Sequence, residues 1–143
     1  MIDTRPDELQ DLPSDVEAKA VPMPEAVVRG APEGSAYVIL THDHALDFMI
    51  AAEALKRSDS PYVGMVGSKT KRAKFQNWYV GEGGTAEELR RLVLPIGAFG
   101  LVDKRPEVIA ALAAAEIMVH IGGGEAISPG KLTRAVSGAT DGR

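Results

Sequence analysis

The sequence contains no cysteine, which excludes disulfide bonds, thiolate metal sites and cysteine nucleophiles. It has no apolar run long enough to cross a bilayer, and its first residues are acidic, unlike those of a signal peptide. Basic residues are not in excess, because 16 Lys and Arg stand against 20 Asp and Glu. This balance argues against binding of nucleic acid over the whole surface. We therefore expect a cytoplasmic protein with no membrane or nucleic-acid partner.

The chain is also too short for two substantial domains. It has 143 residues, of which 45% are apolar and 25% charged, which predicts one globular unit with a modest core. Strand-like and helix-like segments alternate, and this indicates an α/β fold with a parallel sheet covered on both faces. The expected strands are 1–5, 16–21, 36–40, 62–66 and 92–96; the expected helices are 25–29, 45–57, 69–80, 85–91 and 106–119, with a helical turn at 6–12. We assign residues 1–120 to the domain and 121–143 to a glycine-rich tail.

The stretch 61–75 carries the clearest candidate for a ligand site. Residues 62–66 read as a buried parallel strand, and Ser68 is a good N-cap for a helix that begins near Lys69. Gly64 and Gly67 lack side chains, so a ligand could approach the backbone closely there. The spacing differs from that of a Walker A loop. A tight strand-to-helix turn without any ligand is the structural alternative.

Positive charges follow this turn at once. Lys69, Lys71, Arg72 and Lys74 lie in or near the first turns of the expected helix. Free amide groups and the dipole of a helix N-terminus favour a bound anion, and adjacent cations strengthen that preference. The pattern therefore predicts a phosphate site, and a solvated basic helix face is the alternative interpretation.

A second polar segment follows the strand at 36–40. It comprises Thr41, His42, Asp43 and His44, with Asp47 one helical turn after Asp43. The N-cap of the next helix is the plainest role for Asp43. The two histidines could bind a metal or act as acid or base, but the third histidine of the chain has no obvious partner, so we expect no metal site.

Other polar or aromatic positions give weaker indications. Asp3 ends the first strand, and an acid at the end of the second strand of a dinucleotide fold binds the ribose hydroxyls. Trp78 and Tyr79 could stack on a planar ligand, although core packing is the commoner use of such aromatics. The last helix repeats apolar residues on one face, at Val108, Leu112, Ala115 and Val119.

Two of these motifs, taken together, resemble a known family. Residues 41–47 (THDHALD) and 62–72 (YVGMVGSKTKR) are similar to motifs of the C-terminal Rossmann domain of the xanthine dehydrogenase accessory proteins, the XdhC/CoxI family. Residues 95–97 and the helix start at 106–110 resemble that domain's later motifs in the same order. The resemblance covers residues 2–119 and implies a three-layer Rossmann-like fold.

The resemblance also implies a function. Members of the family bind the molybdenum cofactor and deliver it to molybdenum hydroxylases such as xanthine dehydrogenase. We accordingly expect an accessory protein rather than a turnover enzyme, with an apo-hydroxylase as its partner. The expected cofactor-binding residues are Asp3, Thr41, His42, Asp43, His44, Gly64, Gly67, Ser68, Lys69 and Arg72.

The sequence departs from the family at its start. The family's domain opens with a strand and a glycine-rich turn, and this sequence begins at what resembles the second strand. The usual pyrophosphate loop is therefore missing, which weakens the alternative of an NAD(P)-linked oxidoreductase with His42 or His44 as acid or base. We expect a homo-oligomer or a second chain to complete the sheet. A further alternative is an interaction module that keeps only the fold.

Overall fold

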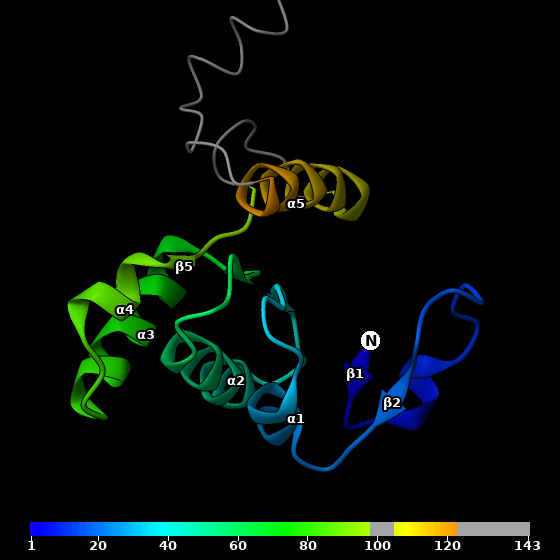
Figure 1. Ribbon diagram of the computed structural model, residues 1–143, viewed down its shortest axis with the longest axis horizontal. Coiled ribbons are helices and arrows are strands. Elements are labelled where there is room, and N and C mark those ends of the chain that lie inside the picture. The colour runs from blue at the N-terminus through cyan, green and yellow to red at the C-terminus, as the bar shows by residue number, and fades with distance from the viewer. Residues whose placement is uncertain (98–104, 123–143) are drawn as a thin grey trace, which may run out of the picture.

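The computed structural model describes residues 1–97 and 105–122, in which strands and helices alternate as the sequence predicts (Figure 1). The strands are β1 (Ile2–Asp3), β2 (Lys19–Ala20), β3 (Tyr37–Ile39), β4 (Val63–Met65) and β5 (Leu92–Val93). The helices are the 3₁₀ turn η1 (Pro6–Leu9), α1 (Pro24–Gly30), α2 (His44–Lys56), α3 (Lys69–Gly81), α4 (Ala86–Arg90) and α5 (Pro106–Ile121). The predicted tail lies, from residue 123 on, outside the described residues.

All pairings in the described chain are parallel, which confirms the α/β prediction. They form two sheets, however, and not the single sheet that the sequence indicates: β1 pairs with β2, and β4 lies between β3 and β5. The difference arises because β1 and β3 do not bond to each other but line the two sides of one groove.

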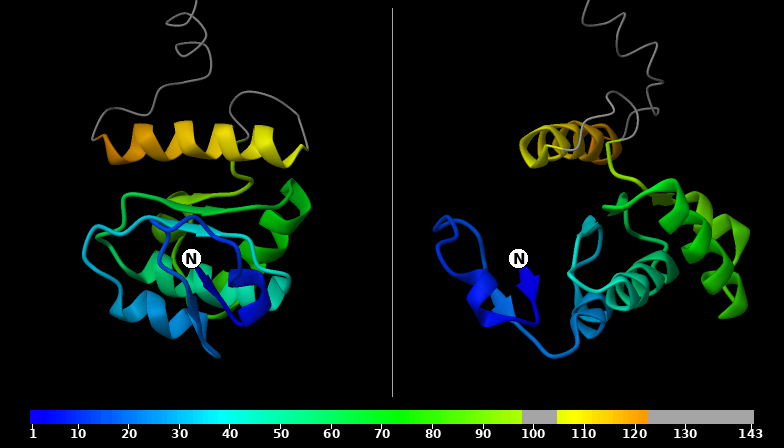
Figure 2. Two further views of the ribbon diagram at one scale, coloured as in Figure 1. Left: turned by 90° about the vertical axis from the view of Figure 1, so that its right-hand side faces the viewer. Right: turned by 180° about the vertical axis from the view of Figure 1, so that it is seen from behind.

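Helices cover the three-stranded sheet on both faces (Figures 1 and 2). The first three, α1 to α3, lie along one face, and α5 crosses the other. Phe48 of α2 packs edge-on against Phe75 of α3, with ring centroids 5.1 Å apart, and both rings contact Trp78. Phe75 also stacks on Tyr79. The aromatic residues of α3 are therefore used for core packing.

The face that α5 presents to the sheet differs in part from the predicted one. Ala115 is exposed, whereas Glu116 is buried and joins α5 to the sheet by two hydrogen bonds. Its carboxylate accepts from the Tyr62 hydroxyl at 2.6 Å and from the Gly97 amide at 3.3 Å. Burial, with the bond to Glu116, raises the pKa of Tyr62 above its ordinary range. These polar contacts hold the Glu116 side of α5 against the sheet, and a hydrophobic repeat in the sequence does not reveal them.

Nowhere in the described chain is a helix long and apolar enough for a membrane span.

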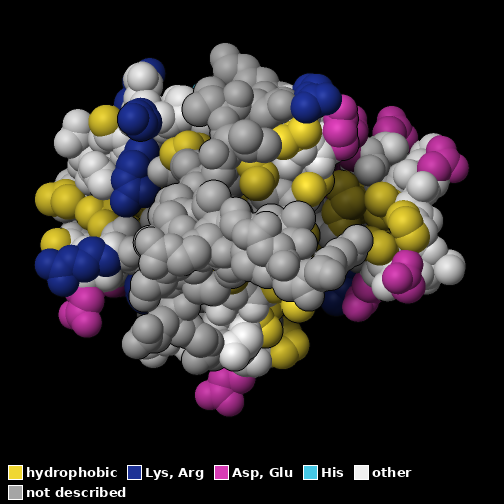
Figure 3. Space-filling model, turned by 90° about the horizontal axis from the view of Figure 1, so that it is seen from above, with side chains coloured by type: hydrophobic (Ala, Val, Ile, Leu, Met, Phe, Trp, Pro, Cys, Tyr) yellow, Lys and Arg dark blue, Asp and Glu magenta, His cyan; other side chains and the backbone are white. Residues whose placement is uncertain are grey.

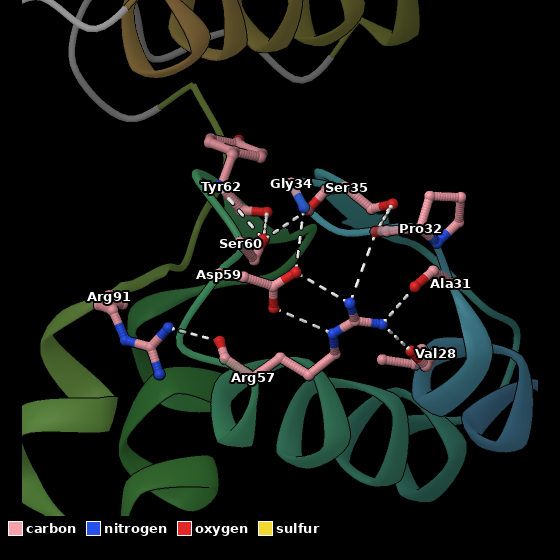
Figure 4. Close-up of polar contacts among 10 residues, drawn as sticks. All are labelled: Val28, Ala31, Pro32, Gly34, Ser35, Arg57, Asp59, Ser60, Tyr62 and Arg91. Carbon is pink, nitrogen blue, oxygen red and sulfur yellow. Dashed lines mark hydrogen bonds and ion pairs between the residues drawn. The ribbon is translucent and has the colours of Figure 1, made fainter.

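One arginine holds together the connections that lead into β3 and β4 (Figure 4). The guanidinium of Arg57 donates to the carbonyl oxygens of Val28 and Ala31, each at 2.7 Å. It also pairs with Asp59 at 2.8 Å, and Asp59 accepts from the Gly34 amide at 3.0 Å. The bonds from Arg57 and Gly34 lower the pKa of Asp59 to about 2. The end of α1, the entry to β3 and the end of α2 are thereby held together.

Candidate functional site

The carboxyl ends of β3 and β4 are joined by a buried ion pair. Asp47 accepts from the Thr41 amide, just after β3, at 2.8 Å. Its other oxygen pairs with Lys71 Nζ at 2.7 Å, and the same ammonium donates to the Val66 carbonyl, just after β4, at 2.9 Å. The two side chains are only 1% and 9% exposed. Every charge is therefore matched by a partner, as burial requires.

Sequence reasoning placed Asp47 on a helix face and Lys71 in a cluster of cations, but it did not pair them. A usable signal was present in the sequence. Each residue lies in the first turn of a helix that directly follows a buried strand, and the two strands are consecutive. In a parallel sheet such first turns meet at the same edge.

The segment after β3 forms a tight turn. Asp43 caps α2, since its Oδ1 accepts from the Ala45 amide at 2.8 Å, as predicted. The Thr41 hydroxyl donates to the Asp43 carbonyl at 2.8 Å and accepts from the Asp43 amide at 3.2 Å. His42 and His44 lie exposed on this edge.

Asp3 lies at the carboxyl end of β1 on the same edge of the molecule. Its pKa is lowered chiefly by a hydrogen bond from the Arg5 side chain and, more weakly, by the charge of His42. The pair with Arg5 has an N to O distance of 3.2 Å. Asp3 and Thr41 line the same groove, so the carboxyl ends of β1 and β3 lie on one side of the molecule.

The predicted turn after β4 is also confirmed as a helix start. Ser68 Oγ accepts from the Lys71 amide at 3.1 Å and caps α3, while the Lys69 side chain is exposed. A Cβ on Gly67 would lie 2.6 Å from the Lys71 stem and 2.8 Å from Leu94. Gly67 is therefore needed for the close packing of these two side chains.

Gly64 and Arg72 have structural partners of their own. A Cβ on the buried Gly64 would overlap the ring of Tyr62, which already fills that space. Arg72 donates to the carbonyl oxygens of Leu94 and Leu92, at 3.0 and 3.3 Å, and so ties α3 to β5. Anion binding by Arg72 stays a prediction, as does ligand contact at Gly64.

No metal centre is formed by the side chains in residues 1–97 and 105–122. Within these ranges no group of three His, Asp or Glu residues is placed to hold an ion. His120 lies on α5, where its Nδ1 is 2.8 Å from the Glu116 carbonyl oxygen and its ring packs edge-on against Tyr62. These contacts of His120 involve Glu116 and Tyr62 and do not involve His42 or His44.

Comparison with known proteins places this fold in a family. A family model described as the XdhC Rossmann domain matches residues 1–117. A search of curated proteins finds no match. The parallel strands alternating with helices agree with such a domain. The chain therefore belongs to the family of XdhC Rossmann domains, and this membership indicates an accessory role in xanthine dehydrogenase maturation.

Proposed function

We propose that the chain binds the molybdenum cofactor at the carboxyl edge of β3 and β4 and passes it to an apo-hydroxylase. Molybdopterin carries a phosphate, and the observation that supports the proposal is the N-terminus of α3 at this edge. The Ser68 side chain satisfies the Lys71 amide, while no acceptor among the described residues bonds the amides of Lys69 and Thr70. These two donors and the helix dipole suit an anionic group.

Lys69 is the side chain best placed to assist them. Lys71 is neutralised by Asp47, and Arg72 is engaged by two carbonyl oxygens. The exposed ammonium of Lys69 at the start of α3 is not held in either way by any residue in the described part of the chain. In this proposal Lys69 pairs with the phosphate, and the exposed His42 and His44 flank the remainder of the ligand. The cofactor, when bound, would supply the molybdenum chemistry, and this chain would hold it at the exposed edge.

The experiment is an anaerobic titration of the purified chain with molybdopterin, followed by thermal shift and by pterin fluorescence. A ligand that binds only the folded state raises the melting temperature. We expect Lys69→Glu to weaken binding at least about fivefold, because a like charge then faces the phosphate. Lys74→Glu is the matched control, since it makes the same charge change at another exposed lysine of α3. No pterin-dependent shift, or equal losses in the two variants, would contradict the proposal.

A nucleotide is the second candidate ligand, and the position of Asp3 favours it. This carboxylate ends β1 and lines the groove beside β3, where dinucleotide folds bind a ribose. The same titration with NAD(H) and NADP(H) tests this alternative. Stabilisation by a nucleotide that Asp3→Asn abolishes would support an oxidoreductase-like site. A lack of response to both ligand classes would leave an interaction module.

A further inference from the structure

A cavity lies among the helices on the side of the sheet away from α5 (Figure 1). Its walls come from α1, α2, the last turns of α3 and the connection from α3 to α4, and its volume is about 520 Å³. Cavities of this size commonly hold small molecules. None of its lining residues belongs to the carboxyl edge of β3 and β4, because the cavity lies at the opposite end of α3 from Ser68 and Lys69.

A buried carboxylate at the wall of this cavity lacks a partner. Glu25 is only 6% exposed, and its Oε2 accepts no hydrogen bond from any residue in the described part of the chain. A charged oxygen that is shielded from water and left unmatched costs free energy. A donor supplied by a ligand would recover that cost.

Tyr79 lines the same cavity and is also buried. Its hydroxyl makes no hydrogen bond of good geometry with the described residues. Burial, with a smaller effect of the nearby Glu88 carboxylate, raises the pKa of Tyr79 to about 12. The hydroxyl is therefore uncharged at neutral pH, and two polar side chains of one wall are incompletely satisfied.

The lining carries more acidic than basic side chains. Its charged members are Glu25, Glu53, Glu82, Glu88, Arg29 and Lys56. Both basic side chains lie within ion-pair distance of the same carboxylate, that of Glu53, at 3.3 and 3.9 Å. Within residues 1–97 and 105–122, the other three carboxylates have no ion-pair partner. Such a lining attracts cations and disfavours anions.

This excess of acidic side chains is local to the cavity. Figure 3 views the molecule from the side of α5, where most of the visible Lys and Arg side chains lie toward α3 and α4. The visible Asp and Glu side chains lie mainly toward β1 and β2. The acidic lining at the far end of α3 is therefore not part of a uniformly negative surface.

Aromatic and apolar side chains complete the lining. The ring centroid of Trp78 lies 5.6 Å from that of Phe48 and 5.8 Å from that of Phe75, so core packing holds the indole in place. Trp78 is nevertheless only partly buried and lines the cavity. Met23 and Met49, which are exposed, supply adaptable thioether chains. Because an aromatic ring attracts a cation to its face, this wall suits an organic cation.

We propose that this cavity binds a small organic amine, with its ammonium group at Glu25 and its apolar part against Trp78. Since Oε2 of Glu25 is shielded in the free chain, the ammonium reaches it by displacing flexible lining side chains such as Met23 and Met49. A metal ion is a poorer occupant, because no group of three His, Asp or Glu side chains in the described ranges is placed to hold one.

The probe is phenylethylamine, which joins an ammonium group to an aromatic ring. Trp78 is the single tryptophan of the chain, so tryptophan fluorescence reports directly on the cavity. We expect saturable one-to-one binding in calorimetry together with a change in this emission. Phenylethanol keeps the shape but lacks the charge and should bind at least about tenfold more weakly. Phenylpropionate, which is negative, should not bind.

Variants locate the ammonium group. Glu25→Gln keeps the shape of the side chain but removes its charge, and it should weaken phenylethylamine binding at least about tenfold. Glu107→Gln makes the same change at an exposed position of α5 and is the matched control. Glu82→Gln, at an exposed lining residue, should weaken binding about twofold and serves if Glu25→Gln does not fold. Lys69→Glu should leave amine binding unchanged, which separates this test from that of cofactor binding.

Several outcomes would overturn the proposal. Equal losses in Glu25→Gln and Glu107→Gln would place the ammonium elsewhere. Phenylpropionate binding as tight as that of the amine, or amine binding that leaves the Trp78 emission unchanged, would do the same. N-acetyl-lysine amide presents its ammonium as a protein side chain does. If it bound more tightly than phenylethylamine, the site would belong to a protein partner and not to a small amine.

Discussion

Lys71 Nζ and Asp47 Oδ2 lie 2.7 Å apart, although they belong to different helices and both are removed from solvent. Asp47 also accepts from the segment after β3, and Lys71 donates to the segment after β4. The ion pair therefore connects α2, α3 and the ends of these two strands. A buried pair of this kind contributes less to net stability than its geometry suggests, because both charges lose their hydration. Its main effect is to fix how α2 and α3 begin relative to the sheet.

Removing one member of this pair should lower the free energy of unfolding substantially. Asp47→Asn leaves the buried Lys71 ammonium without its counter-charge, and we expect a loss of about 3–5 kcal/mol in the free energy of unfolding. Lys71→Met should cost a similar amount. Urea denaturation measures both values, and the double variant Asp47→Asn with Lys71→Met should lose less than the sum of the two. Strict additivity would show that the two charges do not interact.

The exposed pair of Arg29 and Glu53 serves as the control for this series. Its N to O distance is 3.3 Å, but the arginine side chain is half exposed. Surface pairs contribute about 0–1 kcal/mol. We therefore expect Glu53→Gln to change the unfolding free energy by less than about 1 kcal/mol.

Replacing either of two glycines by alanine should change the stability of the protein, in opposite directions at the two positions. Gly64→Ala places a methyl group 2.5 Å from Cε1 of the Tyr62 ring, a steric overlap that should destabilise the protein by about 1–3 kcal/mol. Gly81→Ala, in the last turn of α3, meets no atom within 4 Å and should stabilise it by up to about 1 kcal/mol. Thermal unfolding of both variants checks the signs. Equal effects would contradict the assignment of the space beside Gly64 to Tyr62.

Arg72 should contribute to the stability of the folded protein. Arg72→Met leaves the carbonyl oxygens of Leu92 and Leu94 without this donor, with an expected loss of about 1–3 kcal/mol. Lys74→Met removes a positive charge from the exposed side of the same helix and should have little effect. If Arg72→Met unfolds as easily as the wild type, the two carbonyl bonds do not stabilise α3 against β5.

The pair of Arg57 and Asp59 predicts a pH dependence. The pKa of Asp59 falls from 3.8 to about 2 on folding. Its ionised form is therefore stabilising above the ordinary pKa, and this stabilisation is lost as the pH falls through 3.8 toward 2. We expect the melting temperatures of wild type and Asp59→Asn to differ most above pH 5 and to converge near pH 2. A gap that is constant with pH would exclude this linkage.

Much of the fold could be predicted from the sequence because its signals are local. Apolar runs marked β3 and β4, and Asp43 and Ser68 marked the helices that follow them. The separation into two sheets could not be predicted, since pairing depends on which edges meet in space. The ion pair of Asp47 with Lys71 and the bonds of Arg72 were missed for a related reason. Charge patterns suggest exposed residues, and only tertiary contacts show that these side chains are used internally.

The attachment of α5 has a consequence for how the molecule opens. Glu116 is the one residue buried in that helix, and its bonds to Tyr62 and Gly97 are polar. No residue of α5 belongs to the apolar core cluster of the described residues, whereas α2 and α3 share aromatic packing there. We therefore expect α5 to detach as a cooperative unit at a lower free energy than global unfolding. Such a partial opening would expose the face of the sheet that α5 covers while leaving the Asp47–Lys71 edge intact.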